Sequence, residues 1–154
     1  NMDDMMFTSF KDIFKNSNVK IETSNDEYKV ASTALLCEAA SMDGVFDENE
    51  KKLILILIQK QFNVDENEAK KIYIEGKNLA ENSSQLYGFT RVIKESWDNE
   101  KRISLLEMLW ELAYVDGELD AAEDMLIRRI AGLIHVEDRD RIEAKQRILK
   151  KLNK

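Results

Sequence analysis

Two acidic segments, residues 43–50 and 116–123, carry the residues whose types and spacing could do chemistry. Each begins with an Asp-Gly pair, and further carboxylates follow it. Carboxylate oxygens suit hard cations such as Ca²⁺ and Mg²⁺, whereas zinc and copper favour His and Cys. The candidate metal ligands are Asp43, Asp47, Glu50, Asp116, Glu118, Asp120 and Glu123.

Neither acidic segment is an EF-hand. A twelve-residue EF-hand loop requires Gly at its sixth position and a bidentate Glu at its twelfth. Counted from Asp43, those positions hold Glu48 and Ile54, and the segment that begins at Asp116 lacks both residues as well. Ca²⁺ or Mg²⁺ bound here would therefore occupy a site of another kind.

Helix capping is an alternative role for the same carboxylates. Asp47 and Glu50 have the spacing of a capping box, in which each side chain accepts from the other residue's backbone N–H. Asp120 and Glu123 repeat that spacing. The glycine of each Asp-Gly pair, Gly117 in the second segment, would then end the preceding helix in the left-handed conformation. Under this interpretation the acidic segments only start and stop helices.

Capping leaves part of each segment unexplained. Asp43 and Asp116 would lie at helix C-termini, where a carboxylate opposes the helix dipole. The second segment is the better candidate for a cation, because Glu118 and Asp124 add further carboxylates to it. Both interpretations, helix caps and a weak divalent-cation site, stay open at the level of the sequence.

The elements that carry these segments are predicted to be helices throughout. The 154 residues include no Pro, 44% are apolar, and the apolar residues recur every three or four positions. Turn-forming residues predict breaks at 16–24, 43–44, 63–65, 82–84, 98–99, 116–117 and 135–137. We therefore expect an all-α fold, a compact bundle of about seven to eight helices.

The two acidic segments belong to a longer internal repeat. A shift of 73 residues aligns residues 36–50 with residues 109–123, so that Leu, Glu, Ala, Asp-Gly, Asp and Glu recur in register. The later breaks at 63–65 and 135–137 correspond with a shift of 72 residues. The repeat predicts an internal duplication of helical hairpins, related by an approximate two-fold axis.

The doubled pattern Glu-x-Ala-x-x-Asp-Gly-x-apolar-Asp-x-x-Glu resembles the tellurite-resistance TerB family. Its copies run from Glu38 to Glu50 and from Glu111 to Glu123, within a similarity over residues 30–152. The resemblance implies an all-α domain, found alone or attached to other modules, as in the membrane-anchored DjlA-type co-chaperones that carry a J domain. This chain has no Pro and therefore lacks the His-Pro-Asp motif of a J domain.

The resemblance also implies a role. The family is linked to tellurite resistance and to general stress responses, has no established reaction, and has acidic positions proposed as divalent-cation ligands. We therefore expect a non-enzymatic stress-response domain that acts by protein interaction and binds divalent cations at the two Asp-Gly segments. The alternative is a purely structural, self-associating helical module whose acidic segments serve only as caps.

Few residues could act as catalytic groups, because the chain contains one Cys and one His. Cys37 aligns with Trp110 in the repeat, so we expect a buried thiol that packs as a small hydrophobic group. His135 lies in a predicted turn and would help to end a helix. A zinc site needs more His and Cys than the chain contains. We expect no enzymatic activity and no cofactor other than Ca²⁺ or Mg²⁺.

Residues 1–25 are predicted to form an amphipathic helix and a polar tether, ahead of a helical domain over residues 26–154. The apolar stripe of this helix consists of Met2, Met6, Phe10, Ile13 and Phe14. Met-rich surfaces adapt to varied partners. The segment from Met2 to Lys15 would pack on its own domain, dock to a protein partner or join copies into a homo-oligomer, and these alternatives stay open.

Charge and hydropathy limit the partners and the compartment. The formal net charge is −7 and the isoelectric point is about 4.9, so the chain as a whole repels nucleic acid. Its local exception is residues 138–154, with seven basic and three acidic residues, which complement a helix dipole. No apolar run is long enough for an integral membrane span, and the start has no secretory-signal pattern. We therefore expect a cytoplasmic protein.

Overall fold

Seven α-helices make up the part of the chain that the structure describes. The computed structural model describes residues 27–42, 47–82, 86–115 and 117–154. The helices are α2 (Glu27–Ala40), α3 (Glu48–Phe62), α4 (Glu66–Asn82), α5 (Leu86–Ser96), α6 (Asn99–Ala113), α7 (Ala121–Leu133) and α8 (Asp138–Lys151). The predicted all-α class is confirmed, since no residue in these ranges belongs to a strand.

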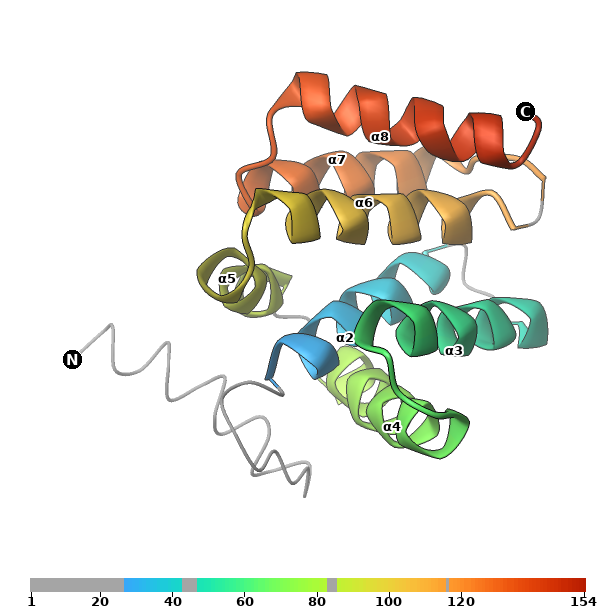
Figure 1. Cartoon of the computed structure of the whole chain (residues 1–154), viewed down its shortest axis with the longest axis vertical. Helices are drawn as coiled ribbons and strands as arrows, with labels where there is room; N and C mark the ends of the chain where they lie inside the picture. The colour runs from blue at the N-terminus through green and yellow to red at the C-terminus, as the bar shows by residue number, and fades with distance from the viewer. Residues whose placement is uncertain (1–26, 43–46, 83–85, 116) are drawn as a thin grey trace.

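The helices form two groups (Figure 1). α6, α7 and α8 lie side by side in one group, α2, α3 and α4 pack together in the other, and α5 contacts both α2 and α7. α2 ends at Ala40 and α3 begins at Glu48, while α6 ends at Ala113 and α7 begins at Ala121, so these boundaries recur at the 73-residue shift. The internal duplication itself stays a prediction.

α2 is the central helix of the bundle. It contacts α3, α4, α5, α6 and α7, and it buries side chains around its whole circumference. Its two buried hydroxyl groups are satisfied locally, because Ser32 Oγ donates to the Tyr28 carbonyl (2.6 Å) and Thr33 Oγ1 donates to the Lys29 carbonyl (2.7 Å). A helix that is apolar all round is typical of a core position.

α4 crosses α2 at close range through Gly76. A Cβ atom on Gly76 would lie 2.6 Å from Thr33 Cγ2 and 3.1 Å from the backbone nitrogen of Ala34. Thr33 is held in place by the hydrogen bond of its hydroxyl group to the preceding turn. The close approach of the two helices therefore requires glycine at this position.

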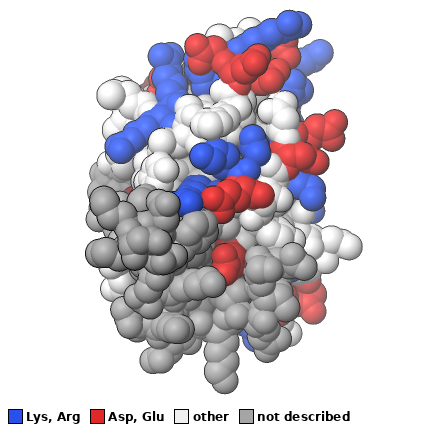
Figure 2. All heavy atoms as spheres, turned by 90° about the vertical axis from the view of Figure 1, so that its left-hand side faces the viewer, with Lys and Arg blue, Asp and Glu red and all other residues white. Residues whose placement is uncertain are grey.

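α8 runs parallel to α6 and is joined to it by ion pairs. Arg147 Nη2 lies 3.0 Å from Glu107 Oε1, and one turn later Lys151 Nζ lies 2.6 Å from Glu111 Oε1. Five of the seven basic residues in 138–154 lie within ion-pair distance of a carboxylate. Figure 2 shows Lys and Arg interleaved with Asp and Glu on the face that it presents, so the basic residues form no separate patch there.

Several predicted helix breaks coincide with the observed helix ends. The breaks at 63–65, 98–99 and 135–137 are confirmed to within a residue. The breaks at 82–84 and 116–117 include residues outside the described ranges, and the breaks at 16–24 and 43–44 lie wholly outside them, as does the predicted N-terminal segment. Among the helices that are described, none has the length and apolar character needed to cross a membrane.

Candidate functional site

Asp47 begins α3 as its N-cap, and the first acidic segment forms the predicted capping box. Asp47 Oδ1 accepts from the backbone N–H of Glu50 (2.8 Å), and Glu50 Oε1 accepts from the backbone N–H of Asp47 (3.4 Å). Glu50 is only 3% exposed. Both carboxylates therefore serve the start of α3, while Asp43 lies outside the described residues.

Asp120 begins α7 as its N-cap, but the second acidic segment caps its helix differently. Asp120 Oδ1 accepts from the backbone N–H of Ala122 (2.7 Å), whereas a capping box would use the N–H of Glu123. The predicted box is wrong in this respect, because the carboxylate reaches the second amide of the helix instead of the third. Glu123 is buried, and Asp116 lies outside the described residues.

Gly117 has the left-handed conformation expected of it, but at a different place in the turn. Its φ is +94°, and its N–H donates to the carbonyl of Tyr114, the residue that caps α6 (3.0 Å). It therefore lies three residues past the helix cap and not directly after it, which corrects the prediction. The carbonyl oxygen of Gly117 accepts from Lys154 Nζ at 2.7 Å.

The remaining carboxylates of the second segment are used in different ways. Glu118 and Asp120 are exposed. Asp124, expected to strengthen a cation site, instead forms ion pairs with Arg128 (3.1 Å) and Lys145 (3.5 Å). Within the described ranges, no three His, Cys, Asp or Glu side chains lie close enough together to hold a metal ion. The described carboxylates alone therefore do not assemble the predicted ligand set.

The Glu that opens each copy of the repeated motif has a different environment in each half. Glu38 is partly buried on α2, and this burial raises the pKa of its carboxyl group. Glu111 on α6 instead accepts from Lys151 Nζ at 2.6 Å. The motif Glu of the second copy is therefore paired with a lysine of α8, whereas the environment of the motif Glu of the first copy is set mainly by burial.

The single Cys and the single His occupy structural positions. Cys37 is buried in α2, and burial raises the pKa of its thiol to about 12, so the thiolate that a nucleophile needs is scarce at neutral pH. His135 has a positive φ of 61° just after α7. Its N–H donates to the Gly132 carbonyl and that of Val136 donates to the Ala131 carbonyl, which is a Schellman motif. The predicted role of His135 in ending a helix is confirmed.

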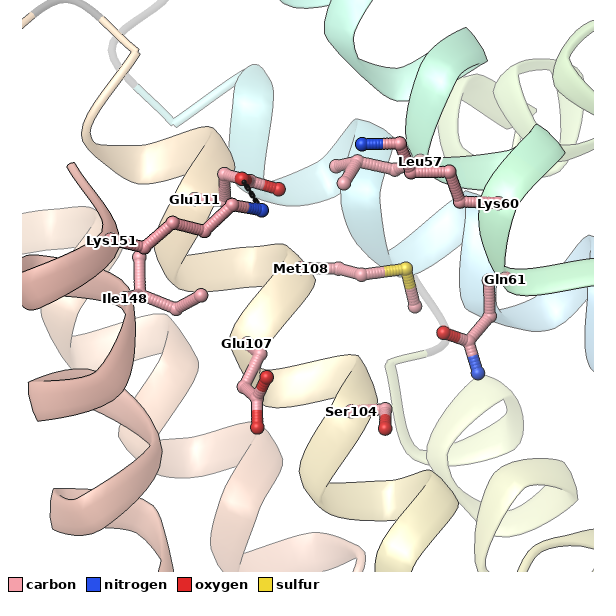
Figure 3. A pocket seen from close by; sticks show the side chains of 9 residues that line it. All are labelled: Leu57, Lys60, Gln61, Ser104, Glu107, Met108, Glu111, Ile148 and Lys151. Carbon is pink, nitrogen blue, oxygen red and sulfur yellow. Dashed lines mark hydrogen bonds and ion pairs between the residues drawn. The ribbon is translucent and has the colours of Figure 1, made fainter.

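A groove between α3, α6 and α8 is a feature that the sequence did not indicate (Figure 3). Its cavity volume is about 160 Å³. It is lined by Leu57, Lys60, Gln61, Ser104, Glu107, Met108, Glu111, Ile148 and Lys151. In Figure 3 the Met108 side chain extends from α6 into the space facing α3, while Lys151 turns toward Glu111. These residues come from three helices far apart in sequence, so no local pattern could have found the groove.

Comparison with known proteins identifies one family. The sequence model of the family described as tellurite resistance protein TerB matches residues 29–146. No curated protein and no solved structure matches the chain significantly. The matched residues extend from α2 into α8 and include both acidic segments.

Proposed function

The chain belongs to the tellurite resistance protein TerB family, and we propose that it is a non-enzymatic stress-response domain of the cytoplasm. In this proposal the domain acts by binding a protein partner, and its second acidic segment is a weak site for Ca²⁺ or Mg²⁺. The first acidic segment is assigned to helix capping, because Asp47 and Glu50 bond to each other's backbone N–H groups.

The observation that carries the cation-binding part is a positive group already held at the second acidic segment. The Lys154 ammonium donates to the Gly117 carbonyl at 2.7 Å. Glu118 is the next residue and is exposed, and Asp120 uses only one of its carboxylate oxygens for Ala122. A backbone carbonyl with carboxylate oxygens is a donor set that Ca²⁺ takes. Asp116, which precedes this carbonyl in sequence, would complete the set.

The groove between α3, α6 and α8 supports the protein-interaction part. Its apolar lining residues are Leu57, Met108 and Ile148. Lys60 on its rim has no ion pair with any described residue, whereas Lys151 is paired with Glu111. The other lining residues are polar or charged, so the groove offers a small apolar floor inside a polar rim, an arrangement typical of protein interfaces. A partner that places an apolar anchor next to a carboxylate would satisfy both the groove and Lys60.

A calorimetric titration tests the cation site. Ca²⁺ and then Mg²⁺ are titrated into chelator-treated protein, alongside the Asp43→Asn/Asp116→Asn variant. We expect heat of binding and a higher melting temperature, since a ligand that binds only the native state stabilises it. Both effects should be lost in the variant, whose melting temperature without cation serves as the control for folding. A flat titration at millimolar cation would contradict the site.

The groove has a test of its own. The Met108 methyl signal is followed by NMR while a capped Asp-Phe-Asp peptide is added as a probe of apolar and acidic character. We expect the signal to shift in the wild type and to stay unchanged in Lys60→Glu. Equal shifts in both proteins, or none in either, would remove the groove as the interaction site.

A structural, self-associating module is the second candidate. The capping box of Asp47 and Glu50 favours it, because there the acidic residues have a complete structural role. In this alternative, copies associate through residues 2–15. Deleting residues 1–19 and measuring the mass in solution distinguishes the two. A fall from a dimer or larger assembly to a monomer favours the structural module, and an unchanged mass argues against it.

A further inference from the structure

We propose that the groove between α3, α6 and α8 is a docking site for the chain's own N-terminal segment, residues 2–15, with Phe7 as the anchor. This inference rests on the proposed function, since it names an occupant for the same groove. The segment lies outside the described ranges. Docked in the groove, it competes with a protein partner and limits how strongly that partner binds.

The size of the groove fits one aromatic side chain. Its cavity volume is about 160 Å³, and Leu57, Met108 and Ile148 form its apolar floor. A protein cavity of roughly 150 Å³ accommodates a benzene ring. The Met108 side chain extends into this space (Figure 3), and a thioether makes favourable contacts with aromatic rings. A single phenylalanine ring is therefore an anchor of suitable size.

Lys60 sets the charge that the occupant should carry. It is exposed on the rim of the groove and forms no ion pair with a described residue. The other charged lining residues are paired. Lys151 is paired with Glu111, and Glu107 is paired with Arg147. The groove therefore presents one surplus positive charge, which favours an occupant with a carboxylate near its apolar anchor.

The N-terminal segment contains this combination. Asp3 and Asp4 precede Phe7 by four and three residues, a spacing that places side chains on the same side of a helix. No other phenylalanine of residues 1–26 has a carboxylate at this spacing. Phe7 is therefore the ring that fits both the apolar floor and Lys60.

The described chain begins close to the groove. Glu27 starts α2 beside the end of α3 (Figure 1), and the ring centroid of Tyr28 lies 5.8 Å from that of Phe62, the last residue of α3. Lys60 and Gln61, which line the groove, directly precede Phe62. The N-terminal segment is thus joined to the domain at the same end of α3 that carries the surplus charge.

The length of chain between the anchor and α2 favours docking within one molecule. Phe7 precedes Glu27 by 20 residues, which can span up to about 70 Å. A ligand joined to its site by a linker of suitable length has an effective concentration in roughly the millimolar range. A second copy at micromolar concentration supplies the same residues at a far lower concentration. The segment of the same chain is therefore the favoured occupant.

Paramagnetic NMR of the full chain tests where the segment lies. A nitroxide is attached at Thr8→Cys, next to the anchor, in a chain that also carries Cys37→Ala, so that the label has one attachment site. We expect the Met108 methyl signal to be lost while the nitroxide is oxidised and to return when it is reduced. The methyl group of Met125, exposed on α7 and outside the groove, should keep its signal. A Met108 signal of undiminished intensity would overturn the proposal.

Two variants and a mixed sample extend this measurement. Lys60→Glu should restore the Met108 signal. Lys52→Glu makes the same change of charge at an exposed residue of α3 that does not line the groove, and it should leave the signal lost. In the mixed sample, one copy carries the nitroxide and another carries the observed methyl groups. Equal loss of the Met108 signal there would assign the groove to a second copy and overturn docking within the chain.

Competition is measured with the capped Asp-Phe-Asp peptide, again in the full chain. We expect Phe7→Ala to raise the affinity for the peptide by about threefold to tenfold, because a groove that is mostly occupied binds a ligand in proportion to its unoccupied fraction. Phe10→Ala is the matched control and should change the affinity less than about twofold. Thermal unfolding of each variant confirms that it is folded.

The outcomes distinguish the docking of the segment from the function of the groove. Equal peptide affinity in the wild type and Phe7→Ala would overturn docking of the segment and leave the groove as an interaction site. Absence of peptide binding in every variant, together with an undiminished Met108 signal in the labelled chain, would overturn both.

Discussion

The two acidic segments share a spacing and have different uses. In the first, Asp47 and Glu50 accept from each other's N–H groups, and Glu50 is buried. In the second, Asp120 accepts from Ala122, and the turn before it is bound by the Lys154 ammonium. The same spacing of carboxylates therefore forms a capping box in the first segment, whereas in the second segment the turn before the N-cap accepts a hydrogen bond from a lysine.

The helix pairs next to these segments also differ in the kind of contact that joins them. α2 and α4 meet through a close contact without charge, at Gly76 and Thr33. α6 and α8 are linked by the ion pairs Arg147–Glu107 and Lys151–Glu111. Close packing does not depend on charge, whereas exposed ion pairs are screened by salt. The contact of α2 with α4 at Gly76 therefore rests on packing, whereas ion pairs add to the contact of α6 with α8.

Gly76→Ala should have the largest effect on stability, because it disrupts the contact between α2 and α4. The new Cβ would lie 2.6 Å from Thr33 Cγ2, so the helices must move apart. We expect a loss of about 2 kcal/mol in the free energy of unfolding, measured by urea denaturation. Gly132→Ala is the control, because nothing lies within 4 Å of a Cβ there and alanine favours the helix by up to about 1 kcal/mol. Equal effects of the two substitutions would refute the close contact.

Asp47→Ala and Asp120→Ala compare the two caps directly. Loss of an N-cap costs about 1 kcal/mol. The Asp47 variant should lose roughly 0.5 kcal/mol more, because it also disturbs the buried Glu50 that completes the capping box. Urea denaturation of both variants measures the difference. If Asp120→Ala proves the more costly, the assignment of the first segment to capping is wrong.

Cys37 makes the first half sensitive to alkali, while its counterpart Trp110 does not titrate. Burial raises the pKa of the Cys37 thiol to about 12, so the folded chain keeps a proton that the unfolded chain releases near its ordinary pKa. The contribution is complete below about pH 8.5 and is lost as the pH rises toward 12. Between pH 7 and 9.5 we expect Cys37 to account for a fall of about 1 kcal/mol in the free energy of unfolding.

The pH dependence has a simple control. Cys37→Ala should lower stability by a constant amount and flatten the curve over this range, which ends below the ordinary pKa of Tyr. A slope that persists unchanged in Cys37→Ala would assign the alkaline sensitivity to other groups.

Lys151→Met should have the smallest effect, in the second half. The pair with Glu111 is short, at 2.6 Å, but the Lys151 side chain is 55% exposed. We expect a loss of about 0.5 kcal/mol at low salt that disappears in 1 M NaCl. Lys150→Met, without such a pair, should show no salt-dependent loss. A cost that persists undiminished at high salt would show that packing, and not charge, joins α8 to α6.

The helices were largely predictable from the sequence, because turn residues and missing prolines act locally. The capping box at Asp47 and Glu50 was predictable for the same reason, since its members lie within one turn. The all-round burial of α2 was not, because no amphipathic pattern marks a helix surrounded by others. The resemblance to the family rested on a motif with fixed local spacing, and the match of the family model to residues 29–146 confirmed it.

The candidate site was predictable only in part. Sequence spacing could not distinguish a bond from Asp120 to Ala122 from one to Glu123, because both amides lie within reach of the N-cap carboxylate. Nor could it reveal the contact of Lys154 with Gly117, or the pairing of Asp124 with Lys145, since these depend on how α8 lies against α6 and α7. Contacts between residues far apart in the sequence therefore decide which carboxylates form ion pairs.

Amide NMR spectra of the full chain during a Ca²⁺ titration test the central claim most directly, that the two segments have separate uses. We expect the largest shifts at residues 117–123, which include the Gly117 carbonyl and the exposed carboxylates of Glu118 and Asp120. The amides of Asp47 and Glu50 should stay unchanged, because their bonds are internal to the capping box. Shifts that are equal in the two segments, or larger at Asp47 and Glu50, would contradict that division.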